Sequence, residues 1–145
     1  MKARTKARSI ALQVLYEVDL TGHLPLVVLQ ERIAEEEITD QNMIDFITKI
    51  VVGVSPIIGK LDGFIAQHAP EWPLDQVASI DRNIIRIALW EFAVEVCTPL
   101  KVAINEAIEL SKIYGSESTP RFVNGVLGSL AERQTEILTS IKNLR

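Results

Sequence analysis

The sequence contains few side chains whose type and spacing suit metal binding or covalent catalysis. His23 and His68 lie far apart, and neither has a cysteine or carboxylate at the spacing of a metal-ligand set. Cys97, the single cysteine, lies in an apolar run with Lys101 as its nearest cation, so we predict a buried thiol rather than an activated nucleophile. Phosphate-binding loops, dinucleotide-binding loops and hydrolase elbows are absent from the sequence. We therefore predict a protein that is not an enzyme and uses no metal or cofactor.

The cations at the start of the chain are better suited to ligand binding. Of the 15 basic residues, four lie in the first eight positions, and no acid precedes Glu17. The rest of the chain then has 11 basic and 19 acidic residues, a net charge of −8 against −4 for the whole. The four cations are Lys2, Arg4, Lys6 and Arg8. Clustered Lys and Arg bind a phosphate backbone by releasing its counterions, so residues 1–8 are either a phosphate-binding arm or a solvated end that aids solubility.

Arg121 and Phe122 form a second candidate site after the polar loop 116–119. A phenylalanine near a helix start either packs inward or is exposed beside the cation. The second arrangement stacks the bases of single-stranded RNA. The residues alone leave both alternatives open.

Apolar residues recur at helical spacing along the whole chain, and no segment alternates with the period of a strand. The sequence therefore predicts an all-α protein. The expected helical segments are residues 4–20, 24–37, 40–69, 75–97, 98–115, 119–130 and 131–144.

Several residues predict where these helices begin, bend and end. We expect Thr98 and Thr119, each followed by proline, to cap helix N-termini, and Gly115 to end a helix in the left-handed conformation. Pro56, between two glycines, is expected to kink or split the 40–69 segment. Gly125 and Gly128 are expected to permit close helix packing.

Charged residues among apolar neighbours predict structural ion pairs between helices. These residues are Arg86, Glu91 and Glu106.

The length and the 48% hydrophobic content predict one domain, residues 1–145, with the basic arm 1–8 at its start. The rigid stretch from Pro70 to Pro73 suggests two helical halves, residues 9–69 and 74–145. A signal-peptide core and a membrane-spanning apolar run are absent from the sequence, and a lone cysteine suits a reducing compartment, so we expect a cytoplasmic protein.

Five stretches of the sequence are similar to the NusB family of transcription antitermination factors. They are ALQVLYE (11–17), DRNIIRIALWE (81–91), VAINEAIEL (102–110), KIYG (112–115) and RFVNGVLG (121–128). The similarity is specific at the start and in the last third, and weak between about residues 20 and 75. It implies a compact bundle of about seven helices in two crossed three-helix halves.

The resemblance also implies a function. NusB-like proteins bind the boxA element of nascent RNA jointly with ribosomal protein S ten, also called Nus factor E, and join the RNA polymerase antitermination complex, chiefly at ribosomal RNA operons. By similarity, the basic N-terminus together with Arg121 and Phe122 forms the RNA face. Tyr16, Asp81 and Arg82 would meet the protein partner. From the residues alone, Tyr16 is equally compatible with a partly buried position. Asp81 is equally compatible with a structural role, in which its negative charge stabilises the N-terminus of its helix.

Two other functions remain compatible with the sequence. One is a helical protein-interaction module without an RNA role. The other is an accessory to ribosomal RNA modification, because NusB-like domains also precede ribosomal RNA methyltransferases. A homodimer that hides the RNA face would be a regulatory variant of the antitermination function rather than a rival to it.

Overall fold

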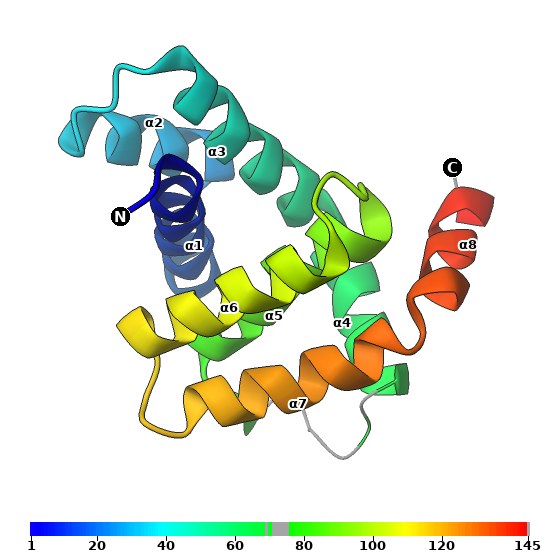
Figure 1. The fold of residues 1–145 in the computed structure, drawn as a ribbon. Helices are drawn as coiled ribbons and strands as arrows, with labels where there is room; N and C mark the ends of the chain where they lie inside the picture. The colour runs from blue at the N-terminus through cyan, green and yellow to red at the C-terminus, as the bar shows by residue number, and fades with distance from the viewer. Residues whose placement is uncertain (69, 71–75, 145) are drawn as a thin grey trace. The chain divides into compact units, whose positions relative to one another are not determined.

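The structure, a computed structural model, describes residues 1–68, 70 and 76–144, and within them every regular element is helical (Figure 1). The all-α expectation is confirmed. The chain divides into two compact units, Met1–Ile57 and Ile58–Arg145.

The first unit is built from α1 (Ala3–Thr21), α2 (Pro25–Glu35), α3 (Gln41–Val54) and the 3₁₀ turn η1 (Ser55–Ile57). Each of the three α-helices packs against the other two. Gly22 ends α1 in the left-handed conformation, with φ 75° and its N–H donating to the Val18 carbonyl, because glycine has no Cβ to strain there. Asp40 caps α3 by accepting the Asn42 N–H at 3.0 Å. The core of this unit includes the fully buried aliphatic residues Ile10, Leu12, Leu15, Ile47 and Ile50.

The boundary between the units coincides with the predicted break in segment 40–69. Pro56 lies in η1, between α3 and α4 (Ile58–His68). Proline lacks an N–H and cannot continue the α-helical hydrogen-bond ladder. The division therefore follows Ile57, whereas the sequence placed the break at Pro70 to Pro73. Residues 71–75, including the expected helix start at Asp75, lie outside the described residues.

The second unit is organised around α5 (Ser79–Leu89), which packs against the three helices α4, α6 (Leu100–Tyr114) and α7 (Thr119–Ala131). Figure 1 shows α6 and α7 side by side. The chain finishes with α8 (Gln134–Leu144). The predicted helices 119–130 and 131–144 correspond closely to α7 and α8.

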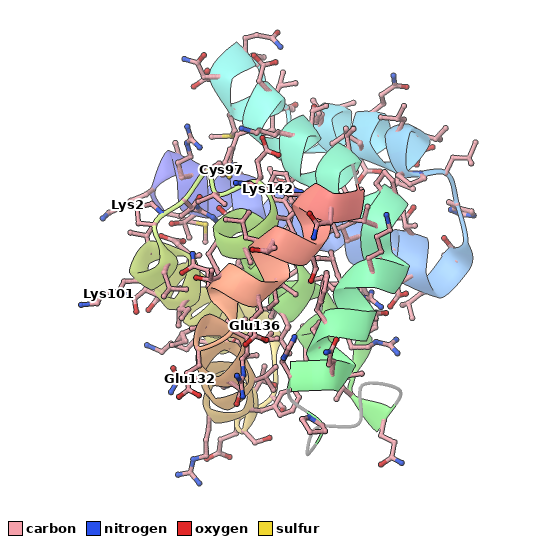
Figure 2. All side chains as sticks on the ribbon, turned by 90° about the vertical axis from the view of Figure 1, so that its right-hand side faces the viewer. Lys2, Cys97, Lys101, Glu132, Glu136 and Lys142 are labelled. Carbon is pink, nitrogen blue, oxygen red and sulfur yellow. The ribbon has the colours of Figure 1, made fainter. Side chains whose placement is uncertain are left out.

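A five-residue π-helix, η3 (Trp90–Val94), continues α5 without a break, and all five of its residues are buried. The Glu95 N–H donates to the Trp90 carbonyl at 2.9 Å, five residues back. Gln134 of α8 donates from Nε2 to the Phe92 carbonyl at 2.7 Å. Val96 then turns the chain with φ 53°, and Cys97 is exposed in the loop that follows (Figure 2). The prediction of a buried thiol was wrong, because the chain leaves the helix before reaching Cys97.

The two predicted threonine caps are replaced by tertiary hydrogen bonds. The Thr98 hydroxyl donates to Glu91 Oε1 at 2.7 Å, and α6 begins after Pro99 without a side-chain cap. Thr119 is the first residue of α7 rather than its cap, which is Ser118.

Gly115 ends α6 as expected, but with φ −88° rather than in the left-handed conformation. Glycine is needed at this position because there is no room for a side chain. A Cβ there would lie 2.5 Å from Thr119 Cβ. At Gly128, by contrast, a Cβ would meet nothing within 4 Å, so close packing does not explain that glycine.

Arg86 forms an ion pair between helices, and its partner is Asp62 of α4. Nε and Nη2 of Arg86 each donate to one carboxylate oxygen at 2.7 Å, and the Arg86 side chain is 4% exposed. Asn83 adds an acceptor at 3.1 Å from Nη1. Glu91 accepts the Thr98 hydroxyl, and Glu106 is half-buried on α6; an ion-pair role for these two glutamates stays a prediction.

Candidate nucleic-acid interface

The predicted basic arm is the start of a helix. The Lys6 N–H donates to the carbonyl of the N-cap residue Lys2 at 2.9 Å, so the first turn of α1 is closed. Lys2 and Arg4 are exposed, Lys6 is half-buried and Arg8 is 4% exposed. Three of the four cations are therefore accessible to a phosphate backbone. Arg8, predicted to contact RNA, instead lies in the interior of the protein.

An aromatic ring on α3 explains how two cations at i and i+4 are tolerated at this helix start. The Cζ atoms of Arg4 and Arg8 lie 3.9 Å and 5.1 Å from the ring centroid of Phe46. Both distances fall within the range of cation–π attraction. Sequence reasoning missed Phe46, because nothing near residue 46 indicates that it meets the first turns of the chain.

In the second unit, a hydrogen-bonded turn precedes the Arg121 and Phe122 pair. The Thr119 hydroxyl oxygen accepts the Ser116 N–H at 2.9 Å and lies 3.2 Å from each carboxylate oxygen of Asp81. Thr119 is 1% exposed. The network therefore ties the loop between α6 and α7 to the first turn of α5.

Asp81 was predicted to meet a protein partner, and the structure places it half-buried in this network. Burial raises the pKa of the Asp81 carboxyl above its usual 3.8, and the hydrogen bond from Thr119 opposes that rise. Its neighbour Arg82 is half-buried as well. Contact of either residue with a partner stays a prediction.

Arg121 and Phe122 line a groove of about 430 Å³ together with Asp81 and the start of α5. The other described lining residues are Gln76, Val77, Ala78 and Ser118. Arg121 is exposed and Phe122 half-buried, so a cation and part of an aromatic ring border the same hollow. Such a groove offers one charge for a phosphate and one face for a base.

Tyr16, the remaining predicted site residue, is half-buried on α1. Its contact with a protein partner stays a prediction.

Within the residues that the structure describes, no three His, Cys, Asp or Glu side chains gather as a metal-binding set. Among those same residues, each helix is too short or too polar to cross a lipid bilayer.

The helical fold, the exposed cations of α1 and the groove lined by Arg121 and Phe122 define a class of protein. It is the class of all-α proteins whose basic and aromatic surfaces suit the binding of an anionic polymer. The chain belongs to the NusB family, whose profile matches residues 5–132. The resemblance read from the sequence is thereby confirmed.

Similarity to known relatives covers nearly the whole chain. The transcription antitermination protein NusB of Roseiflexus sp. (strain RS-1) is 44% identical over 135 residues, 92% of this chain and 94% of that protein. The protein of the same name from Dehalococcoides mccartyi (strain CBDB1) is 45% identical over 130 residues, 90% of each. A crystal structure of antitermination factors NusB and NusE in complex with dsRNA matches with a TM-score of 0.79 at 26% identity, covering 97% of this chain and 98% of that one.

Proposed function

We propose that this chain is a transcription antitermination factor that binds boxA RNA jointly with ribosomal protein S ten, the Nus factor E. It joins the RNA polymerase antitermination complex in the cytoplasm, chiefly on ribosomal RNA operons, and acts by binding rather than by catalysis. The full chain, residues 1–145, serves as one RNA-binding domain.

The observation that carries the proposal is the similarity to named antitermination proteins over at least 90% of the chain. A similar solved chain belongs to a complex of NusB, NusE and RNA, which supports the same two partners here. The RNA-binding residues are Lys2, Arg4, Lys6, Arg121 and Phe122, and the protein partner is met by Tyr16, Asp81 and Arg82. Arg8, which is buried, stabilises the basic start of α1.

The accessible charge explains why a second protein is needed. Each phosphate contact on single-stranded nucleic acid contributes a salt slope of about −0.7, and each stacked base about 1 to 3 kcal/mol. Three accessible cations, Arg121 and one half-buried ring therefore give modest affinity. A tight and selective complex requires additional contacts from the partner.

The test is fluorescence anisotropy of labelled boxA RNA and of scrambled RNA, each with and without the S ten protein, across a salt series. We expect boxA preference and higher affinity with the partner present. Replacing Lys2, Arg4 and Lys6 with alanine should lower the salt slope by about 2.

A matched variant controls for the loss of net charge. Lys60, Lys101 and Lys142 are exposed on α4, α6 and α8, and Figure 2 labels the last two. Their replacement by alanine removes the same charge and should leave the slope nearly unchanged. If neither RNA binds even with the partner present, the proposal fails and a helical protein-interaction module becomes the better account.

A further inference from the structure

Phe46 on α3 contacts the basic start of α1 through two cations. The ring centroid lies 3.9 Å from Arg4 Cζ and 5.1 Å from Arg8 Cζ. Phe46 is 6% exposed and Arg8 is 4% exposed, whereas Arg4 is exposed. The ring therefore bridges a buried guanidinium and an accessible one.

This contact has a physical consequence for the helix start. Like charges at i and i+4 repel and weaken an isolated helix end. A ring face attracts both guanidinium groups, and more strongly where water is excluded. The first two turns of α1 are thus held against α3 although their own charges favour fraying.

Helix geometry separates the four cations into two rows. At 3.6 residues per turn, Arg4 and Arg8 share one side of α1, while Lys2 and Lys6 lie roughly 160 to 200° around the axis from Arg4. The Lys2 side chain points away from the first turn, as Figure 2 shows. The arginine row faces the ring, and the lysine row lies on the other side of the helix.

Arg4 remains able to bind an anion while it contacts the ring. Its guanidinium is planar and carries its N–H donors in the plane, so a group that packs by its face keeps its edge free for phosphate. The same side chain then anchors the helix and contributes a charge to its surface.

We propose that Phe46 is a positioning residue of the RNA-binding surface. By holding Arg4 and Arg8, it fixes the first two turns of α1 before RNA binds, so that Lys2, Lys6 and the edge of Arg4 meet the phosphate backbone without an ordering cost. This role rests on the proposed RNA-binding function and adds a residue to it.

The test separates the ring's π face from its bulk. Phe46→Leu keeps an apolar side chain of similar burial but removes the attraction for cations, and Phe46→Tyr keeps the aromatic face. Phe64→Leu on α4, where the ring is half-buried, is a control for loss of a phenylalanine in the other unit. Amide hydrogen exchange is measured on the free proteins, and boxA affinity is measured with the S ten protein across a salt series.

We expect Phe46→Leu to speed exchange at residues 6–8, the first amides of α1 with a helical acceptor, while the amides of α3 stay protected. It should weaken RNA binding about three- to tenfold, with an unchanged salt slope because every cation remains. Phe46→Tyr and Phe64→Leu should resemble the wild type.

Two results would overturn the role of Phe46 and leave the RNA function standing. One is a Phe46→Leu protein with wild-type exchange at residues 6–8 and wild-type affinity. The other is equal weakening by the leucine and tyrosine variants, which would make the ring a packing residue only. Failure of the wild-type protein to bind boxA with its partner is a different result, which removes the proposed function and with it this role.

Discussion

Replacing Thr119 with valine removes one buried hydroxyl while keeping the shape of the side chain. That hydroxyl accepts the Ser116 N–H at 2.9 Å and lies 3.2 Å from both oxygens of Asp81. The neutral bond contributes about 1 kcal/mol and a bond to a charged group about 1.5 to 3 kcal/mol. Asp81 is half-buried, so water compensates part of its loss. We expect Thr119→Val to lower the free energy of unfolding by about 2 to 3 kcal/mol.

The measurement is urea unfolding followed by far-UV circular dichroism, with the midpoint and slope fitted separately. Thr119→Ser is the control, because it keeps the hydroxyl and loses one methyl group, a change of about 1 kcal/mol. The reasoning is refuted if valine costs less than about 0.5 kcal/mol, or if serine costs more than valine.

Three further predictions follow from the second unit. Asp62→Ala leaves the guanidinium of Arg86, whose side chain is 4% exposed, without its carboxylate; urea unfolding should show a loss of about 3 kcal/mol, and a loss near zero would mean that the pair is not structural. Because the folded pKa of Asp81 is raised, its contribution to stability is complete below pH 3.8 and is lost as pH rises through the folded pKa. The stability of the wild type relative to Asp81→Asn should therefore fall across that window in pH-dependent urea unfolding, and a constant or rising difference would contradict the raised pKa. Cys97 is exposed, so a thiol reagent such as DTNB should modify it in the folded protein within minutes; reaction only after unfolding would contradict its placement.

Local signals in the sequence were sufficient for most of the fold. Gly22 ends α1 and Asp40 caps α3, and each acts on backbone groups within a few residues. Pro56 splits the long third segment for the same reason. These features depend on neighbours in sequence, which a single chain displays directly.

Predictions failed where a side chain found a partner distant in sequence. Thr98 and Thr119 have the form of helix caps, yet their hydroxyls bind Glu91 and Asp81, 7 and 38 residues away. The prediction for Cys97 failed for a different reason. Cys97 lies in an apolar sequence but is exposed, because η3 widens the helix and Val96 turns the chain outward.

The candidate site was predicted in composition but not in arrangement. The cations and the Arg121 and Phe122 pair were identified from residue type and from the family resemblance. The anchoring of Arg4 and Arg8 by Phe46 was not, because the ring lies 42 and 38 residues away in the chain. In the sequence, an alternating run of cations is compatible with a solvated arm. The contact with α3 becomes visible only in the structure.

Terminator read-through in vitro tests the antitermination claim most directly. The template carries boxA upstream of a terminator and is transcribed by RNA polymerase with the other antitermination components, with and without this protein. We predict that read-through rises only when boxA, the S ten protein and this protein are all present. Read-through that is unchanged by this protein, or equally raised on a template with scrambled boxA, would contradict the account.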